Sequence, residues 1–561
     1  MITHISFEAA AQWEAVQRAW DHLAKDRVIE RIWQRDHTVW KPKPHEIANR
    51  LGWLDIAARM WEEVGDLRGF ADEVRRSGLT DAVLLGMGGS SLAPEVFSRS
   101  QRVADGFLRL HVLDSTDPGA VRSIQERIDL TRTLFIVATK SGGTVETLSG
   151  FKYFFNAVAD AVGIKRTGER FIAITDPGSS LEQLASDHQF LRTFLNDPEI
   201  GGRYSALSYF GMVPAALIGM ELERVLVSAI HEMEKSRAEV PRNSSAACGA
   251  VIATLAQLGR DKLTFLIPGP LASFGDWVEQ LIAESTGKDS VGILPVVGET
   301  PGSPSEYGGD RAFVLIRHCE DESHLALAHE LSEAGHPMIV MTYEDATDLG
   351  GLMFLWEMAT AVAGHVLGIH PFDQPDVEAA KVRARAALAD LRATGHLPRV
   401  DPSADDNGIA VFGAESGTVE EVISRFIGQT RFGDYIAIQA YLTPSPAHDE
   451  MLSRLRLGLR RRFHAATTVG YGPRFLHSTG QLHKGDRGNG LFVQITCDEA
   501  NDLPIPDRAG APESALSFGA LKLAQAIGDG EALHAAGRRL LRVHLRDQDA
   551  GLAKLVSILA G

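Results

Sequence analysis

The stretch AVLLGMGGSSLAPE, residues 82–95, decides the fold class of this 561-residue chain. An apolar run ends in closely spaced glycines and serines, and a helix-forming segment follows. This order is typical of a buried strand, a tight turn and a helix in a parallel sheet. Gly86, Gly88 and Ser91 come within one residue of the dinucleotide-binding pattern GxGxxG, and Asp114 closes the next strand. A nicotinamide-dependent oxidoreductase is therefore one interpretation, and a turn that serves packing alone is another.

Similar strand–loop–helix units continue along the chain. LRLHVLD, TLFIVAT and RFIAITD complete a first series of strands, and KLTFLIP, GILPVVG, AFVLIR and PMIVMTY form a second after a helical stretch at 211–260. A third series comprises GIAVFG, DYIAIQAYL, LFVQITC and LRVHLR. We therefore predict an α/β protein of four parts: a helical N-terminal segment (1–75), two doubly wound parallel-sheet domains (76–245 and 246–390) and an extra C-terminal α/β segment (405–561). Residues 391–408 have the composition of a linker.

Composition limits the class of function. A net charge of −17 disfavours general binding to nucleic acids or anionic membranes. The N-terminus lacks a basic segment followed by an apolar core, and no run of about 18 apolar residues follows. The three separated cysteines form neither a CxxC pair nor a disulfide framework. These features predict a cytoplasmic protein that neither crosses nor binds a membrane.

Two further features have plain interpretations. The histidines include no HExxH or comparable spacing, so we predict no metal site. The most basic run, RLRLGLRRRFH (454–464), is interpreted as the solvated face of a helix rather than as a nucleic-acid contact.

The stretch ATKSGGTVET, residues 138–147, follows the third strand of the first domain. The carboxyl ends of parallel strands meet at one edge of a sheet, so this loop should lie beside the 86–91 turn. Two adjacent loops of this kind fit a phosphate monoester, whereas a dinucleotide needs only the first. The alternative is a helix N-cap without a ligand. The hydroxyl donors are Thr139, Ser141 and Thr144, beside Lys140 and the flexible pair Gly142 and Gly143.

Three later stretches carry groups suited to acid–base chemistry. GGRYSALSYFG (201–211) places Arg203 where a guanidinium could face an oxyanion, and HPFDQPDVEAAK (370–381) ends in Lys381. WVEQLIAESTGKDS (277–290) spaces Gln280 and Glu284 four apart, on one face of a helix. The apolar neighbours of Glu284 could desolvate its carboxylate and suit it to act as a general base. Taken singly, each residue also fits a structural or surface role.

Together these motifs resemble the phosphoglucose isomerase family, whose two sugar isomerase (SIS) domains are doubly wound α/β units. GMGGSSLAPE looks like that family's GIGGSxLGP loop, and ATKSGGTVET is similar to SKTFTTQET, with Gly142 and Gly143 replacing Phe and Thr. GGRYS, QLIAESTGK and FDQPDVEAAK resemble GGRxS, QxxMESNGK and FDQPGVEAGK. The five motifs keep the family's order over roughly residues 75–385.

The resemblance implies an isomerase that interconverts glucose 6-phosphate and fructose 6-phosphate through a cis-enediol, without metal or cofactor. Glu284 would move the proton between C2 and C1, Arg203 would stabilise the enediolate, and Lys381 would assist ring opening. The sugar phosphate would be bound by Gly89, Ser90, Thr139, Lys140, Ser141, Thr144, Gln280 and Gln374. Family members are often dimers, so a homodimer is also implied. A non-catalytic SIS-domain protein would need the hydroxyl loop but no base, and an oxidoreductase would have no role for that loop.

This chain departs from the family's pattern at the ring-opening histidine. The family places its ring-opening histidine, in GQHxFYQLIHQG, between the base and the lysine, and nothing between 284 and 381 matches it. FLHSTGQLHKGD (475–486) does resemble it, with His477 and His483 in the two histidine places, but it follows Lys381. Either the C-terminal segment folds back and delivers His477 to the site, or the likeness is accidental and ring opening is done differently.

The C-terminal third, together with RLGWL (50–54), most resembles the isomerase half of fused transaldolase/phosphoglucose isomerase proteins. About 80 residues precede the first glycine-rich loop, whereas the (β/α)₈ barrel of a transaldolase needs about 250. We therefore predict no transaldolase activity from these residues.

Overall fold

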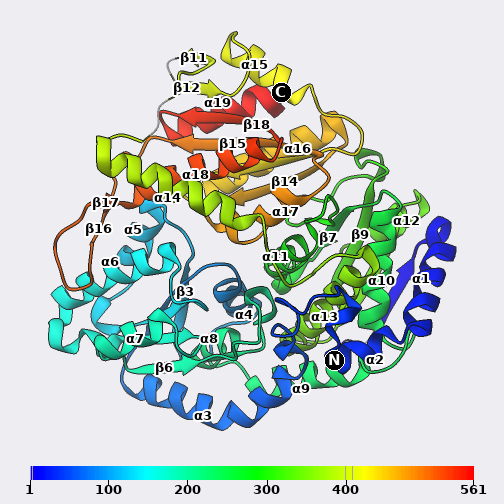
Figure 1. Cartoon of the computed structure of the whole chain (residues 1–561), viewed down its shortest axis with the longest axis horizontal. Coiled ribbons are helices and arrows are strands. Elements are labelled where there is room, and N and C mark those ends of the chain that lie inside the picture. The colour runs from blue at the N-terminus through cyan, green and yellow to red at the C-terminus, as the bar shows by residue number, and fades with distance from the viewer. Residues whose placement is uncertain (1, 3, 398–399, 407, 561) are drawn as a thin grey trace.

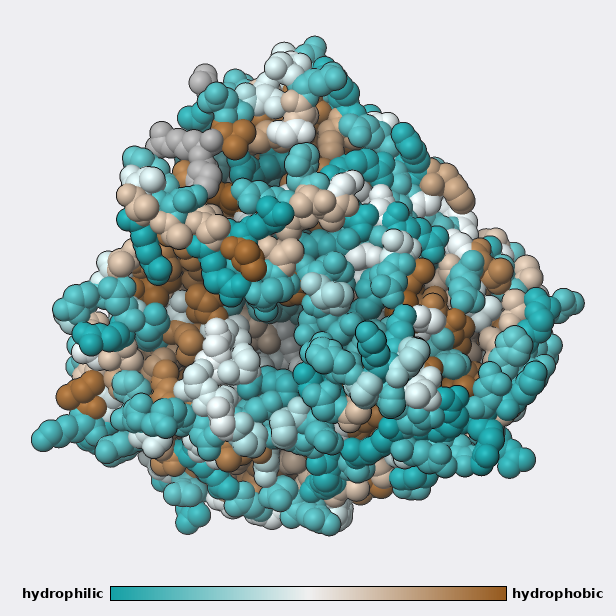
Figure 2. Space-filling model, in the orientation of Figure 1, coloured by the Kyte–Doolittle hydropathy of each residue, from teal (hydrophilic) through white to brown (hydrophobic). Residues whose placement is uncertain are grey.

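The computed structural model describes residues 2, 4–397, 400–406 and 408–560. Three α/β domains surround a common centre, and the C-terminal domain lies above the other two in Figure 1. The face seen in Figure 2 is mostly hydrophilic, with hydrophobic residues in scattered patches. The predicted α/β class with parallel sheets is confirmed.

The first domain is built around a five-stranded sheet. Its elements are α3 (Ile56–Arg76), β2 (Asp81–Gly86), α4 (Leu92–Ser100), β3 (Arg109–Leu113), α5 (Pro118–Arg127), β4 (Thr133–Ala138), α6 (Val145–Val162), β5 (Phe171–Thr175), α7 (Ser180–Asp187), β6 (Arg192–Leu195) and α8 (Tyr209–Leu217). The strand order is β3-β2-β4-β5-β6, and all pairs are parallel. Every residue of β2 and β4 is buried, which explains their uninterrupted apolar sequences.

The second domain repeats this architecture. Its elements are α9 (Leu222–Lys235), α10 (Ser244–Gln257), β7 (Lys262–Leu266), α11 (Phe274–Thr286), β8 (Leu294–Val296), β9 (Arg311–His318), α12 (Leu325–Glu333), β10 (Met338–Tyr343), α13 (Leu349–Leu367) and α14 (Val377–Thr394). Before these come β1 (His4–Glu8), α1 (Trp13–Lys25) and α2 (Val28–Trp33). The sheet order is β1-β10-β9-β7-β8, with β1 antiparallel to β10. The N-terminal segment, predicted to be helical, therefore also supplies an edge strand.

The C-terminal domain has a six-stranded sheet. Its elements are β11 (Ala404–Asp406), β12 (Ile409–Phe412), α15 (Val419–Ile427), β13 (Tyr435–Ala440), α16 (Pro446–Phe463), β14 (Ala466–Tyr471), α17 (Gly480–Gly485), β15 (Gly490–Cys497), β16 (Pro504–Ile505), β17 (Leu516–Ser517), α18 (Phe518–Ala535), β18 (Arg539–Leu545) and α19 (Gln548–Ala560). The order is β11-β12-β18-β15-β13-β14, in which β18, β15, β13 and β14 are parallel. Strands β16 and β17 form a separate pair.

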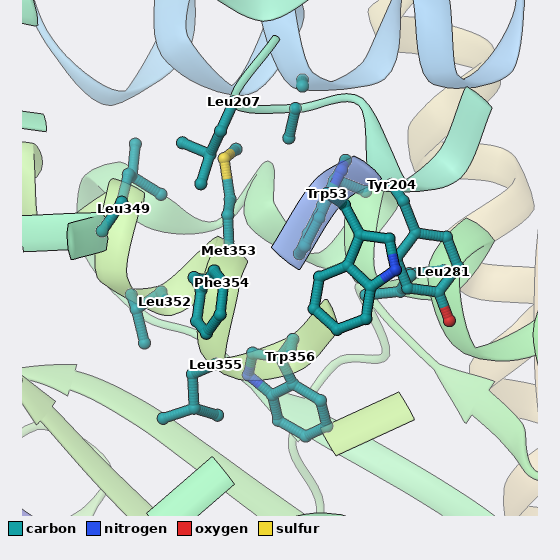
Figure 3. Close-up of a cluster of buried hydrophobic side chains, with 14 of the residues drawn as sticks. Trp53, Tyr204, Leu207, Leu281, Leu349, Leu352, Met353, Phe354, Leu355 and Trp356 are labelled. Atoms are coloured by element: carbon teal, nitrogen blue, oxygen red, sulfur yellow. The ribbon is translucent and has the colours of Figure 1, made fainter. Parts of the chain in front are cut away.

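One hydrophobic core joins the first two domains. Figure 3 shows Trp53 and Tyr204 packed beside Leu281, Phe354 and Trp356, so residues from the N-terminal segment, the Arg203 loop, α11 and α13 meet there. Among the described residues, one helix, 346–367, is long and apolar enough to cross a membrane, but 89% of its most apolar 18-residue stretch is buried inside the protein. It is therefore a core helix.

The prediction that the arginines of α16 form a solvated face is wrong for two of them. Arg456 and Arg460 are buried, and they donate hydrogen bonds to the carbonyls of Val297 and Thr300 in the second domain. Arg460 also lies 2.7 Å from Glu306 Oε2. A guanidinium has five N–H donors and can satisfy carbonyls and carboxylates together, which makes burial tolerable.

Candidate active site

The glycine turn after β2 is a close-packed junction of three segments. A Cβ on Gly88 would lie 2.7 Å from Gln280 Nε2 and 2.8 Å from the carbonyl oxygen of His477. A Cβ on Gly89 would lie 1.9 Å from the carbonyl oxygen of Gly202. Ser90, in the same turn, is buried. The turn is glycine-rich because backbone must touch backbone here.

We expect Gly89→Ala to lower the free energy of unfolding by about 1–3 kcal/mol, because the added methyl group must push the Arg203 turn away. Urea denaturation would measure this. Gly143→Ala is the matched control, since its Cβ would meet nothing within 4 Å. Equal stability of the two variants would contradict the tight packing of Gly89 on Gly202.

The hydroxyl loop lies beside this turn, as β2 and β4 are neighbours. Thr139 Oγ1 lies 2.7 Å from Thr144 Oγ1. Gly142 has a φ of +76° and packs against the start of α7, so it shapes the loop. Lys140 points elsewhere: its ammonium pairs with Asp176 and donates to the carbonyl of Pro198 at 2.9 Å. The loop thus presents neutral donors, not its lysine, to the space in front of it.

That space is a cavity of about 340 Å³. Lys381, in the second turn of α14, is exposed and lines it, as does His477 of the C-terminal domain. The lining also includes Ser141, Gly143, Thr144, Glu146, Val377, Ala380, Ala384, Leu388, Lys484, Leu521 and Gln525. All three domains therefore contribute walls.

Glu284 and Arg203 form an ion pair, although neither is among the residues that line the cavity. Arg203 Nη1 lies 3.2 Å from Glu284 Oε1, and the two side chains are 3% and 14% exposed. Arg203 also donates to Gln374 Oε1 at 3.0 Å and to Ser285 Oγ at 2.7 Å. Its Nη2 donates to the carbonyl oxygens of Pro371 and Asp373, so the guanidinium is held in one orientation.

Gln280 connects this pair to the cavity. Its Nε2 donates to Glu284 Oε2 at 3.1 Å and to the carbonyl oxygen of His477 at 2.7 Å. Gln280 and Glu284 are one helical turn apart on α11, as their spacing predicts. The carboxylate is thereby held near the loop that carries the histidine.

Lys288 fixes the loop that carries Gln374. Burial and the nearby Arg203 lower the pKa of Lys288 to about 8. Its ammonium lies 2.8 Å from Asp373 Oδ1. Sequence reasoning did not select Lys288, although it ends the QLIAESTGK motif.

His477 reaches the cavity from the C-terminal domain. Its Nε2 lies 3.0 Å from Glu146 Oε1, and Glu146 is in the first turn of α6. Burial alone would raise the pKa of the Glu146 carboxyl, but the facing His477 holds that pKa below its usual range. Sequence reasoning missed Glu146, whose one signal was its place in the hydroxyl-loop motif. His483 does not reach the cavity: it is buried against Phe492 and Tyr435, and burial holds its pKa well below the usual value.

Arg474, three residues before His477, anchors this loop. It pairs with Glu95, Asp114 and Asp276, and the last two lie 3.2 and 3.5 Å away. Asp114 also accepts a hydrogen bond from Ser91. The acid that a dinucleotide site would offer to a ribose is therefore already occupied, which disfavours the oxidoreductase interpretation. Among the described residues, no group of three His, Cys, Asp or Glu side chains could hold a metal ion.

Comparison with known proteins gives a consistent match. The family model for phosphoglucose isomerase matches residues 48–308. A glucose-6-phosphate isomerase of Rubrobacter xylanophilus is 33% identical over 367 residues, which cover 55% of this chain and 83% of that protein. One of Citrifermentans bemidjiense is 30% identical, covering 59% of this chain and 69% of the relative.

The solved structures show the same fold. A glucose-6-phosphate isomerase of Chlamydia trachomatis superposes with a TM-score of 0.58 at 20% identity, covering 67% of this chain and 86% of that one. A hypothetical protein of Thermus thermophilus superposes with a TM-score of 0.59 at 24% identity, covering 69% of this chain and all of the other.

Proposed function

The chain belongs to the phosphoglucose isomerase family, and we propose that it interconverts glucose 6-phosphate and fructose 6-phosphate by proton transfer through a cis-enediol. The observation that carries this proposal is the Glu284–Arg203 pair, which Gln280 links to His477 in the wall of a cavity that is also lined by the hydroxyl loop. A sugar-phosphate sensor has no need of a buried carboxylate and guanidinium at this place.

The hydroxyl loop would bind the phosphate. Ser141 and Thr144 line the cavity, and Gly143 opens the backbone to it. Thr139 supports Thr144 through their shared hydrogen bond. Lys140 would act by fixing the loop through Asp176, and the turn that contains Gly89 and Ser90 would hold the Arg203 turn in place through its packing on Gly202. Several neutral donors can bind a phosphate monoester without a metal ion.

His477 and Lys381 would open the sugar ring. Both line the cavity, and Glu146 holds the imidazole of His477 in a defined orientation. Ring opening moves a proton from the anomeric hydroxyl to the ring oxygen, and an imidazole is suited to that exchange near neutral pH. Lys381 offers a positive charge to the oxygens that carry the transient negative charge.

Glu284 would then act as the base. It removes the proton from C2 of the open form of glucose 6-phosphate and returns it to C1, while a hydroxyl proton moves from O2 to O1. Fructose 6-phosphate follows the reverse path. Arg203 would stabilise the enediolate oxygens. Gln280 holds Glu284, and Gln374 holds Arg203, so the two glutamines would orient the substrate through the residues that they fix. These steps use no cofactor.

The oligomeric state, the location and the C-terminal domain concern the protein as a whole. Four catalytic residues, Glu284, Arg203, Lys381 and His477, come from one chain, so a homodimer would not be needed to complete the site. The three free cysteines fit a cytoplasmic location. The likeness of the C-terminal domain to that of the transaldolase fusions stays a prediction.

The reaction can be followed directly by ³¹P NMR, with fructose 6-phosphate as the starting material, EDTA present and no nicotinamide added. We expect glucose 6-phosphate to accumulate to equilibrium. Absence of turnover by the wild-type chain would contradict the isomerase proposal. Binding of fructose 6-phosphate without turnover would favour the sensor instead.

Thr144→Val tests the phosphate loop. Valine keeps the shape of threonine but loses the hydroxyl that faces the cavity and Thr139. One charge-assisted hydrogen bond is worth about 1.5–3 kcal/mol, so we expect KM for fructose 6-phosphate to rise about 10- to 100-fold. The effect on kcat should be smaller. Thr147→Val, three residues on and buried in α6, is the control, and an equal rise in its KM would contradict a specific role for Thr144.

A further inference from the structure

We propose that Gln525, on α18 of the C-terminal domain, is a positioning residue that holds the Glu146–His477 pair in the geometry for ring opening. This inference rests on the proposed isomerase function. It assigns a role in the reaction to α18, which lies outside residues 75–385, the region that contains the five family motifs.

Gln525 is the middle member of a buried hydrogen-bond chain. Its Nε2 donates to Glu146 Oε1 at 2.6 Å, and its Oε1 accepts from Thr116 Oγ1 at 2.8 Å. The same Glu146 oxygen lies 3.0 Å from His477 Nε2. Thr116, Gln525 and Glu146 are 0%, 5% and 9% exposed, so these contacts are largely shielded from water although Glu146 and Gln525 line the cavity. The chain runs Thr116–Gln525–Glu146–His477.

The orientation of the amide follows from the charges. If the amide were flipped, its carbonyl oxygen would face the Glu146 carboxylate, and two acceptors would meet in a buried place. The Thr116 hydroxyl can then only donate to Oε1. Glu146 thus receives one hydrogen bond that stabilises its charged form, in addition to the facing imidazole. An ionised, oriented carboxylate keeps His477 Nε2 directed at it.

The helix itself is fixed at the same point. Lys522, one turn earlier on α18, lies 2.6 Å from Asp117 Oδ2, and Asp117 follows Thr116 in the chain. Lys522 and Asp117 are both buried. Breaking a buried pair of this kind leaves an uncompensated charge, so α18 is held at a fixed distance from the Thr116 loop. The amide of Gln525 therefore reaches Glu146 from a rigid support.

A substrate that cannot close its ring isolates this role. Fructose 6-phosphate closes through the hydroxyl on C5, and 5-deoxyfructose 6-phosphate lacks that hydroxyl and stays open. Gln525→Met removes both hydrogen bonds at nearly constant volume. We expect it to lower kcat for fructose 6-phosphate by about 10- to 100-fold, because misplacing a catalytic group by about 1 Å can cost that much. With 5-deoxyfructose 6-phosphate, kcat should change less than about twofold.

Gln494→Met is the matched control, because Gln494 donates to the carbonyl of Ala526 on the same helix but does not touch the chain of hydrogen bonds. It should leave both substrates unaffected. If Gln525→Met does not fold, Thr116→Val should give the same substrate pattern with a smaller loss. Equal losses on both substrates, or no loss on either, would overturn the positioning role. If the wild-type chain turns over neither substrate, the isomerase proposal fails instead.

Discussion

Glu284→Gln is expected to lower kcat for isomerisation by about 10²- to 10⁴-fold, the range that general-base catalysis supplies. Glutamine keeps the shape of the side chain and can still contact Arg203, but it cannot accept the C2 proton. The substrate should still bind, because the hydroxyl loop is untouched. The sharpest measurement is the exchange of the C2 proton of glucose 6-phosphate with D₂O, followed by NMR. That exchange should fall together with turnover.

Glu279→Gln is the control for this prediction. Glu279 lies on the same helix, and burial together with Asp276 raises the pKa of its carboxyl to about 8. The carboxyl is therefore mostly protonated at pH 7, and glutamine resembles that neutral form. We expect little change in kcat. Full activity in Glu284→Gln would remove Glu284 as the base, whereas equal losses in both variants would point to damage to α11.

The parts of the fold that could be predicted are those with continuous apolar strands. β2, β4 and β5 are buried on both faces, so their sequences are apolar except for one polar residue at an end of each strand. β1 escaped because an edge strand of five residues, HISFE, has exposed ends and no continuous apolar run. The burial of Arg456 and Arg460 could not be predicted for another reason: a run of arginines does not reveal which face of its helix another domain covers.

The residues of the site also fall into those that local sequence spacing could relate and those that it could not. Residues within one motif, such as Gln280 and Glu284, could be related through helical spacing. Gln525 could not be related to Glu146, because 379 residues separate them and a glutamine in a mixed helix carries no signal of its own. The Lys140 ammonium was assigned from the motif to the phosphate, but its direction depends on Asp176, 36 residues away.

The placement of His477 is the clearest case of a contact set by domain docking. The likeness of 475–486 to the family's histidine motif left two interpretations open, since the stretch follows Lys381 in the chain. In the structure His477 contacts Glu146, although 331 residues separate the two in the sequence. Four cations of the C-terminal domain hold it in place. The buried Arg456 and Arg460 contact the second domain and the buried Lys522 contacts the first. The partly exposed Arg474 contacts both. These contacts are physical causes that no local pattern reveals.

Arg474→Met is expected to lower the free energy of unfolding by about 2–4 kcal/mol at pH 7, somewhat less than for a fully buried pair because a quarter of the side chain is exposed. Glu95, Asp114 and Asp276 would lose their shared cation, and their mutual repulsion would remain. Isomerase activity should fall too, because His477 lies three residues further along the same loop. Urea denaturation and the ³¹P NMR assay would measure the two effects.

The pH dependence separates lost charge pairing from lost packing. Burial already raises the pKa of Asp114 and of Asp276, and without Arg474 both values should rise further. The folded variant then binds more protons than its unfolded chain, so its stability should increase as the pH falls from 7 toward the unfolded pKa of about 4. The deficit relative to wild type should therefore shrink over that window, whereas a packing defect would be constant. Arg99→Met is the control: Arg99 pairs with the same Glu95 at 2.6 Å but is 62% exposed, so its loss should cost less than about 1 kcal/mol. A deficit of Arg474→Met that does not change with pH would mean that the loop carrying His477 is held by packing alone.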